Sequence, residues 1–363
     1  MSVTGEANLI AGQGQQNGGR QGMTKRTTSA VWVKGIADML AAEGLDVASL
    51  YASVGINPAA LEGPGARTAS EKISHLWEVA VERSRNPAIS LAQPQVVRPA
   101  SFDVVGYTMM SCADLRGAFD RLIRYLLILS DALTMTMVDE GDGYRIDFVL
   151  LGGERPIPRQ RIEFIFVTVI GFCRWIARAD ISPCAIELAY SAPLDLAPYR
   201  SAFGCPVSFD AERNSLTFSH ADMNLSLPTS NPQLADLHER YAGEYLRHFD
   251  HAQTSYRVRE AIVRRLPDGE PRRDEVAVEL CMSERTLQRR LEEERTSFVQ
   301  LLDDTRRELA DQYLGRLHLS LAQAAYLLGF ADQSSFFRAC RRWFKVSPGQ
   351  YRNQLLQGAA ATS

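Results

Sequence analysis

The C-terminal part of this 363-residue chain contains one helical pattern twice, and this repeat constrains the fold more than any other feature. In each copy, a short helix with one apolar face is followed by a tight turn and a second amphipathic helix. The first copy spans 274–280 and 284–293, and the second spans 321–328 and 333–344. Apolar spacing over 298–314 predicts a long helix between them. The pattern therefore predicts an all-α domain in which a rigid helix fixes two helix pairs relative to one another.

The second helix of the first pair presents polar residues that suit a nucleic acid. Leu287 and Leu291 face inward at a spacing of four, which leaves the polar side chains outside. Arginine can donate two hydrogen bonds to guanine and glutamine can pair with adenine in the major groove, while a capped helix N-terminus favours phosphate. Two such helices on one face can read successive major grooves about 34 Å apart. The outward residues are Arg285, Thr286, Gln288, Arg289 and Arg290.

Two segments carry a specific family resemblance. Residues 329–338 read Gly-Phe-Ala-Asp-Gln-Ser-Ser-Phe-Phe-Arg, and residues 342–348 read Arg-Trp-Phe-Lys-Val-Ser-Pro. Together with Arg306 and Ala310 in the long helix, they resemble the DNA-binding domain of the AraC family, and the match extends upstream to Arg273. Cys340 stands where that family usually has a core aromatic residue, and Lys345 stands where it usually has a helix-ending glycine.

The resemblance implies which residues contact DNA. It implies base reading by Arg285, Gln288 and Arg289 in the first pair and by Gln333, Ser334 and Arg338 in the second. Thr286 and Ser335 are further candidate contacts. Arg290, Arg341, Arg342 and Arg352 are expected to contact phosphate rather than bases. For Arg338, a phosphate contact or an ion pair with Asp332 is an equally good interpretation.

The N-terminal half alternates helical and strand patterns. Helical spacing covers 29–44, 70–84, 115–131 and 159–179, and strand patterns cover 133–138, 144–151, 185–190, 207–210 and 215–219. This order predicts an α+β domain. Arg159 and Arg161, at the start of the helix over 159–179, could grip a carboxylate, although a solvated first helical turn is the more ordinary interpretation.

Segments 121–151 and 199–209 resemble the effector domain of one AraC subgroup, the ornithine-utilisation type. That resemblance implies an α+β domain that senses a small molecule, and it argues against the sugar-binding β-barrel of other members. The effector and the residues that bind it stay open. Activation of transcription is expected rather than repression.

The predicted fold class is multi-domain, with an N-terminal α+β effector domain followed by an all-α DNA-binding domain with two helix-turn-helix units joined by a long helix. The expected parts are a disordered extension (1–28), an effector domain (29–231), a helical connector (232–254), the DNA-binding domain (255–355) and a disordered tail (356–363). The helix in 233–249 could instead serve a dimer, although apolar residues at this spacing more often pack within the same chain. Translation could also start at Met23.

Charge and cysteine spacing favour a nucleic-acid-binding protein over a metal-binding, disulfide-bonded or membrane protein. Residues 255–355 carry eighteen Arg and Lys against fifteen Asp and Glu, whereas the whole chain has a net charge of −3. The six cysteines lie far apart without a C-x-x-C pair, so neither a disulfide framework nor a zinc site is expected. The N-terminus has no signal peptide pattern and the apolar runs are too short to span a bilayer, so we expect a cytoplasmic protein.

Two alternatives compete with a transcription regulator. An enzyme would need a catalytic constellation or a cofactor loop, and the sequence has none of the known motifs. A DNA-repair methyl acceptor would need a reactive cysteine before His-Arg, whereas Cys184 is followed by Ala185-Ile186. The other alternative is a sensor that acts through protein partners.

The partners expected of a transcription regulator are promoter DNA, a small-molecule effector and RNA polymerase. A homodimer stays open, and no metal or cofactor is expected.

Overall fold

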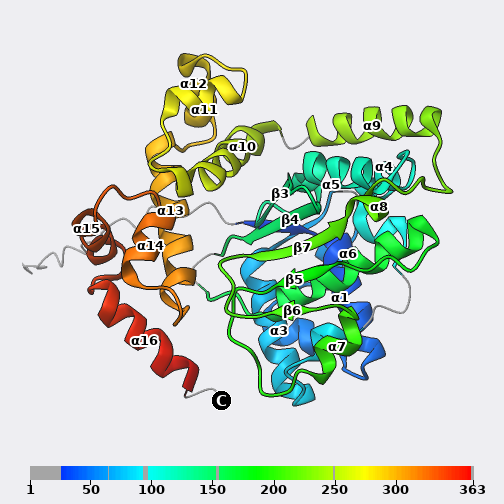
Figure 1. Ribbon diagram of the computed structural model, residues 1–363, viewed down its shortest axis with the longest axis horizontal. Coiled ribbons are helices and arrows are strands. Elements are labelled where there is room, and N and C mark those ends of the chain that lie inside the picture. The colour runs from blue at the N-terminus through cyan, green and yellow to red at the C-terminus, as the bar shows by residue number, and fades with distance from the viewer. Residues whose placement is uncertain (1–25, 64, 93–96, 153–154, 248–249, 361–363) are drawn as a thin grey trace, which may run out of the picture.

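The structure is a computed structural model that describes residues 26–63, 65–92, 97–152, 155–247 and 250–360. Figure 1 shows two parts side by side, a sheet with helices around it and a purely helical part coloured yellow to red. The first part contains the elements up to α9 (Pro232–Arg247), and the second begins at α10 (Asp250–Arg265). The predicted fold class, an α+β domain followed by an all-α domain, is confirmed.

A five-stranded sheet forms the centre of the N-terminal domain, in the order β3-β4-β7-β5-β6. β5 and β6 are parallel and the other pairs are antiparallel. Opposite residues such as Ile146 and Leu216 share one face because side chains alternate along each strand. The strands are β3 (Leu133–Asp139), β4 (Gly143–Leu150), β5 (Ala185–Glu187), β6 (Val207–Ser208) and β7 (Asn214–Ser219).

Helices α5 (Leu115–Leu129) and α6 (Gln160–Ala177) cover the apolar face of this sheet. The ring centroids of Phe119 and Phe218 lie 5.6 Å apart, and those of Phe148 and Phe166 lie 5.0 Å apart. The opposite face is polar, as in the ion pair between Arg145 and Asp147 on β4. One apolar residue of that face, Val149, packs against the core of the helical domain. The sheet therefore buries one face internally and turns part of the other toward the C-terminal domain.

A smaller helical layer lies at the start of the chain. Ser29 accepts a hydrogen bond from the Trp32 amide (3.3 Å) and caps α1, and Trp77 on α3 is buried. The helices predicted from Ser29 onward and over 70–84 are therefore present. The layer contains α1 (Ala30–Ala42), α2 (Val47–Val54) and α3 (Ser70–Ser84), with the pair β1 (Thr27–Ser29) and β2 (Arg67–Ala69). Four of the short helices that the structure describes in this domain were not predicted: α2, α4 (Asp103–Met110), α7 (Ala197–Phe203) and α8 (His220–Met223).

Helix α9 is part of the N-terminal domain rather than a connector. Glu239 forms an ion pair with Arg121 of α5 (3.3 Å), and His238 Nδ1 lies 2.9 Å from Ser111 Oγ, just after α4. Ala242 is fully buried in the same core. The connector expected over 232–254 is wrong for the residues of α9, because charged and apolar contacts from distant segments dock this helix.

The expected ends also differ from the structure. Helix α16 (Pro348–Ala360) continues into the first residues of the expected tail (356–363). Thr27 and Thr28 belong to β1, and Arg26 is 6% exposed, so the extension expected over 1–28 is wrong for its last three residues. Residues 1–25, including Met23, and 361–363 lie outside the described residues.

The C-terminal domain is arranged around α13 (Phe298–Leu314). Its residues Leu301 and Leu309 lie in a single apolar core with residues from both predicted helix pairs and from α10. The pairs are α11 (Arg273–Glu279) with α12 (Glu284–Glu293), and α14 (Leu321–Leu327) with α15 (Gln333–Phe344). A rigid helix between two units is the arrangement that the sequence pattern predicts.

Candidate nucleic-acid interface and buried pocket

The turns of the two helix pairs share one hydrogen-bond pattern. In the first, the amides of Leu280, Cys281 and Met282 donate to the carbonyls of Val276, Val278 and Ala277. In the second, the amides of Leu328, Gly329 and Phe330 donate to those of Ala324, Tyr326 and Ala325. The order of donors and acceptors is the same, so the two turns have equivalent backbone geometry.

The central residue of each turn is left-handed, at φ 55° for Cys281 and φ 68° for Gly329. A Cβ on Gly329 would lie 2.5 Å from the carbonyl oxygen of Gly269. Glycine is therefore needed in the second turn for space as well as for conformation. Cys281 adopts the same conformation with a side chain and bears the strain of a β-carbon.

Both second helices start with a side-chain cap. Ser283 Oγ accepts a hydrogen bond from the Thr286 amide (3.2 Å), and an Asp332 carboxylate oxygen accepts one from the Ser335 amide (2.8 Å). Hydrogen bonds from the amide and hydroxyl of Ser335 hold the pKa of Asp332 below its usual value. Each cap leaves a helix N-terminus exposed to solvent, where it favours an anion.

The candidate base-reading side chains of α12 are exposed and loosely held. Arg285, Gln288 and Arg289 are exposed, and Thr286 is half-buried. Gln288 donates to Glu292 (2.9 Å), and Arg289 forms an ion pair with Glu293 (2.6 Å). Exposed pairs of this kind contribute about 0.5 kcal/mol, so both side chains can leave their partners at small cost.

The candidate residues of α15 are exposed as well. Gln333, Ser334 and Arg338 face solvent, and Ser335 is half-buried. Arg338 donates to Ser335 Oγ (2.9 Å) rather than forming the ion pair with Asp332 that was weighed from the sequence.

The four arginines expected to contact phosphate differ in exposure and in whether other residues already hold their side chains. Arg290 and Arg341 are exposed, while Arg342, also exposed, pairs with Asp303 of α13. Arg352 is half-buried and donates to the Leu314 carbonyl (3.1 Å). Arg352 is thus already engaged in packing α16 against α13, and its phosphate contact stays a prediction.

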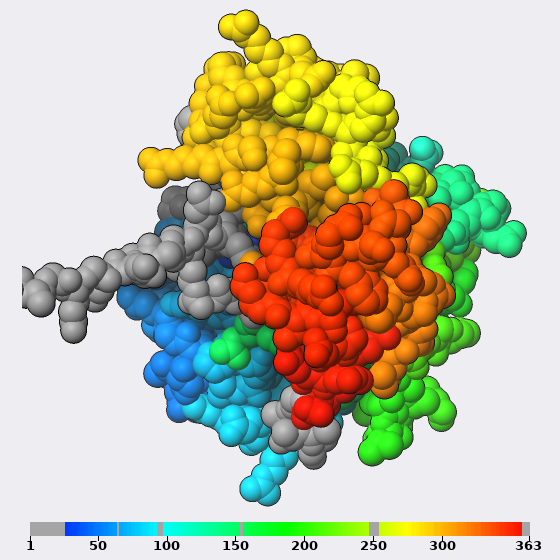
Figure 2. All heavy atoms as spheres, turned by 90° about the vertical axis from the view of Figure 1, so that its left-hand side faces the viewer, coloured from blue at the N-terminus to red at the C-terminus, as the bar shows by residue number. Residues whose placement is uncertain are grey.

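Arg306 joins the long helix to the second turn. Its guanidinium is buried and donates to the carbonyls of Leu328 (2.8 Å) and Gly329 (2.7 Å). It also pairs with Glu270 (3.1 Å) and stacks over Phe330 at 4.3 Å. Lys345, which stands where the family usually has a helix-ending glycine, ends α15 in the left-handed conformation at φ 66°. Figure 2 shows that both helix pairs contribute to one face of the molecule.

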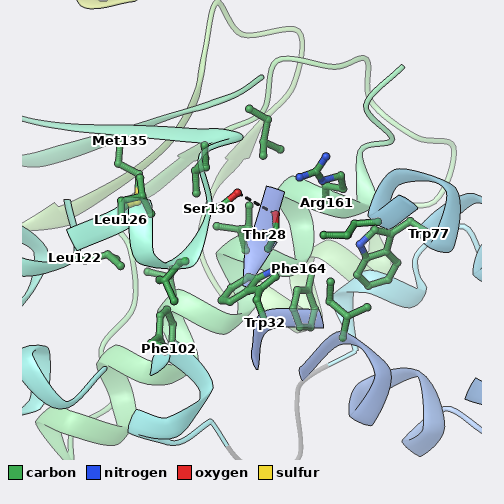
Figure 3. A pocket seen from close by; sticks show the side chains of 17 residues that line it. Thr28, Trp32, Trp77, Phe102, Leu122, Leu126, Ser130, Met135, Arg161 and Phe164 are labelled. Atoms are coloured by element: carbon green, nitrogen blue, oxygen red, sulfur yellow. Dashed lines mark hydrogen bonds between the residues drawn. The ribbon is translucent and has the colours of Figure 1, made fainter. Parts of the chain in front are cut away.

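A buried pocket lies in the N-terminal domain, enclosed by α1, α3, α5, α6 and the edge of the sheet. Its volume is about 40 Å³, and its walls are almost entirely aliphatic and aromatic. In Figure 3, Arg161 lies on one side of the pocket, Leu122 and Met135 lie on the other, and Thr28 and Ser130 lie between them. The hydroxyls of Thr28 and Ser130 are hydrogen-bonded to each other (3.0 Å).

The position of Arg161 corrects the sequence interpretation. A solvated first turn was the ordinary expectation for Arg159 and Arg161, but Arg161 is only 7% exposed and lines the pocket. Burial lowers the pKa of its guanidinium to about 10. Arg159 is more exposed and lies 3.6 Å from the buried carboxylate of Glu163.

The walls of this pocket also contact the helical domain. The Leu133 carbonyl accepts a hydrogen bond from Tyr256 of α10 (3.2 Å), and the Leu150 carbonyl accepts one from Gln312 of α13 (2.7 Å). Leu133 and Leu150 both line the pocket. The same two residues therefore touch the internal space and the domain that carries the helix pairs.

A buried ion pair crosses the same boundary. Arg26, two residues before Thr28, pairs with Glu308 of α13 (2.6 Å), and both side chains are less than 5% exposed. Arg26 also donates to the carbonyls of Asp131 (3.2 Å) and Gly152 (3.3 Å). Because breaking a buried pair leaves an uncompensated charge, this contact fixes α13 against the N-terminal domain.

Comparison with known proteins gives matches to both domains. Residues 44–227 match the family described as the arabinose-binding domain of AraC transcription regulator, N-terminal, and residues 276–354 match a helix-turn-helix domain family. The chain is 26% identical over 333 residues to the ornithine utilization regulator of Pseudomonas aeruginosa, covering 91% of this chain and 97% of that protein. It is 30% identical over 245 residues to the HTH-type transcriptional regulator VirS of Mycobacterium tuberculosis, covering 67% and 72%. The crystal structure of the transcriptional regulator CdpR from Pseudomonas aeruginosa is similar with a TM-score of 0.46 and 19% identity, over 89% of this chain and 98% of that one.

These matches define a transcription regulator with an N-terminal effector-binding domain and a C-terminal helix-turn-helix domain. The chain belongs to the AraC family. Among the described residues, no group of three or more His, Cys, Asp or Glu could hold a metal ion. No helix within the described ranges is long and apolar enough to cross a membrane.

Proposed function

We propose that this protein is an effector-responsive activator of transcription that reads two successive major grooves of a promoter with α12 and α15. The observation that carries the proposal is the equivalent turn geometry of the two helix pairs, each followed by a capped helix with exposed Arg and Gln side chains. Such helices present donors and acceptors that match base edges. Arg290, Arg341, Arg342 and Arg352 would contact phosphates.

The proposal gives the N-terminal domain the role of sensor in the cytoplasm. A small molecule in the buried pocket would favour one arrangement of the two domains over another, because Leu133 and Leu150 connect the pocket to Tyr256 and Gln312. DNA affinity then changes only by the ratio of the effector's affinities for the two arrangements.

The DNA-bound protein would act as a homodimer and recruit RNA polymerase. Leu234, Leu237 and Tyr241 of α9 are exposed at helical spacing, with exposed fractions of 42%, 51% and 56%. A second copy of α9 would cover this apolar row.

The decisive experiment measures binding of the full chain to DNA from upstream of its own gene, titrated against salt and non-specific competitor DNA. Replacing Arg285 and Arg289 by alanine removes two candidate base contacts, each worth about 1–3 kcal/mol. We expect the double variant to bind the specific site about a hundredfold less tightly or worse.

The control is Arg200→Ala, which removes an exposed arginine from α7 in the other domain. This control should bind DNA like the unmodified protein. Equal affinity of the Arg285/Arg289 double variant and the control, at matched salt, would contradict the assignment of α12 as a reading helix.

A further inference from the structure

Arg161 is a buried cation that has no counter-ion among the described residues. No carboxylate of the described residues lies within ion-pair distance of it, and its hydrogen bonds leave only from Nη1, to Ser74 Oγ (3.1 Å) and the Ser70 carbonyl (3.5 Å). Nε and Nη2 donate to no partner in the described part of the chain. Burying an unpaired charge is unfavourable, so a guanidinium in this position is suited to an anion that arrives with the ligand.

The rest of the pocket is unsuited to a polar ligand. Apart from Arg161 and two indole rings, its polar side chains are Thr28 and Ser130, which already bond to each other. A sugar would bring several hydroxyl groups into a wall of Leu, Ile and Phe side chains, where unpaired hydroxyls are costly. A ligand with an apolar body and one anionic group would match this pocket, because the anion can lie at Arg161 and the body along the apolar side chains opposite, such as Leu122 and Met135 (Figure 3).

We infer that this pocket binds a monocarboxylic acid with an apolar body, whose carboxylate pairs with Arg161 and whose body lies among Trp32, Phe102 and Leu126. This inference rests on the proposed function, in which the N-terminal domain senses an effector, and it names the chemical class of that effector. A guanidinium can donate two parallel hydrogen bonds to a carboxylate, and the apolar surroundings strengthen that pair.

The volume of the pocket indicates how such a ligand would act. A space of about 40 Å³ holds roughly three water molecules, so an acid of more than a few atoms must push the walls apart. Leu133 and Leu150 are part of those walls and hold Tyr256 and Gln312 through their carbonyls. Occupancy would therefore shift the strands that hold the DNA-binding domain.

The test measures the thermal unfolding midpoint and the heat of binding of the full chain with butyrate, hexanoate, octanoate and phenylacetate at neutral pH. At least one acid should raise the midpoint and bind with a measurable heat. Methyl octanoate has the same apolar chain as octanoate without the charge, and arabinose represents the sugar class. Both should bind at least tenfold more weakly than the best acid.

Two variants locate the site. Arg161→Met removes the charge but keeps an unbranched side chain, so it should fold at least as stably and lose the response to the acids. Arg161→Lys keeps the charge without the planar fork and should bind about tenfold more weakly. The control Arg200→Met changes an exposed arginine and should respond like the unmodified chain.

The inference is overturned if no acid of the panel binds, if arabinose binds more tightly than every acid, or if Arg161→Met binds the acids as tightly as the unmodified chain. Specific DNA binding, measured on the same preparations without ligand, separates this failure from that of the proposed function. Intact DNA binding with no response to acids refutes only the assignment of the ligand class.

Discussion

The two helix pairs of the DNA-binding domain have the same turn hydrogen bonds but are stabilised differently. The second turn is held by Arg306, whose guanidinium donates to two of its carbonyls, and by a glycine pressed against Gly269. In the first turn, the half-buried Arg257 of α10 donates a single long hydrogen bond to the Leu280 carbonyl (3.5 Å), and Cys281 occupies the left-handed position. The first pair therefore depends more on apolar packing of Leu287 and Leu291, whereas the second also depends on a buried arginine that donates two short hydrogen bonds.

The same backbone geometry is thus reached by two sets of interactions that differ in their sensitivity to substitution. Apolar packing tolerates changes of shape at moderate cost, whereas a buried donor leaves its acceptors unpaired when it is removed. We expect substitutions in the second pair to have larger and more local effects. Amide hydrogen exchange can test this, because peptides from α11–α12 and α14–α15 report on each pair within the intact chain.

The largest effect is expected for Arg306→Met. This change leaves the carbonyls of Leu328 and Gly329 without their donor and Glu270 without its partner. Removing one member of a buried charged network costs about 3 kcal/mol, so exchange in α14–α15 should accelerate about a hundredfold. Arg290→Met, an exposed arginine on α12, serves as the control and should change exchange in either pair by less than about threefold. Equal acceleration in both pairs would show that Arg306 supports the whole domain rather than the second turn.

A smaller effect is expected from the two left-handed turn residues. Gly329→Ala would place a Cβ 2.5 Å from the Gly269 carbonyl oxygen at φ 68°, and we expect a loss of roughly 2 kcal/mol in the local stability of α14–α15. In the first turn, Cys281→Gly removes a β-carbon from the same conformation and should stabilise α11–α12 by up to about 1 kcal/mol.

Cys281→Ala is the matched control for both changes, because it keeps a β-carbon in the left-handed conformation and should be close to neutral. If Gly329→Ala were as mild as Cys281→Ala, the close approach to Gly269 would have no energetic weight. The two turns would then be equivalent in stability as well as in geometry.

The sequence predicted the local parts of this molecule well. The helix pairs, the long helix and the strands over 133–138 and 144–151 depend on periodicity and turn residues within a few positions of one another, and all of them are present in the structure. Family resemblance supplied the positions of Arg306 and Lys345. The contacts that give them their roles, with Glu270 and with the left-handed helix end, became visible only in three dimensions.

The parts that sequence reasoning missed depend on distant partners. Helix α9 looks like a connector until Arg121 and Ser111, more than a hundred positions away in the chain, are brought to it. Arg161 looks solvated because the first turn of a helix usually is, but in the fold its side chain is buried and donates a hydrogen bond to Ser74 of α3. Arg26, Tyr256 and Gln312 carry no local signal for a domain interface, because their partners are carbonyls and a carboxylate in the other domain.

The smallest effect that we expect is a difference in how the stability of α15 and of α12 depends on pH. The cap of α15 is the carboxylate of Asp332, whose pKa is lowered by hydrogen bonds from the amide and then the hydroxyl of Ser335. A lowered pKa in the folded state means that the ionised cap stabilises the helix above the ordinary aspartate value of 3.8 and that this contribution disappears as the pH falls through the lower folded value. Asp332→Asn keeps the size and an acceptor oxygen but does not ionise, so the unmodified chain should show slower exchange in α15 than the variant at neutral pH, and the difference should shrink toward pH 3.

The first pair supplies the control, because the Ser283 hydroxyl does not titrate. Ser283→Ala should weaken α12 by about 1 kcal/mol, and by the same amount at both ends of the pH range. A pH-dependent effect at Ser283, or a pH-independent one at Asp332, would contradict the assignment of the charged cap to the second pair. With the expected result, acid would loosen α15 before α12. The protein would then lose its contacts in the groove that α15 is proposed to read before those in the groove proposed for α12.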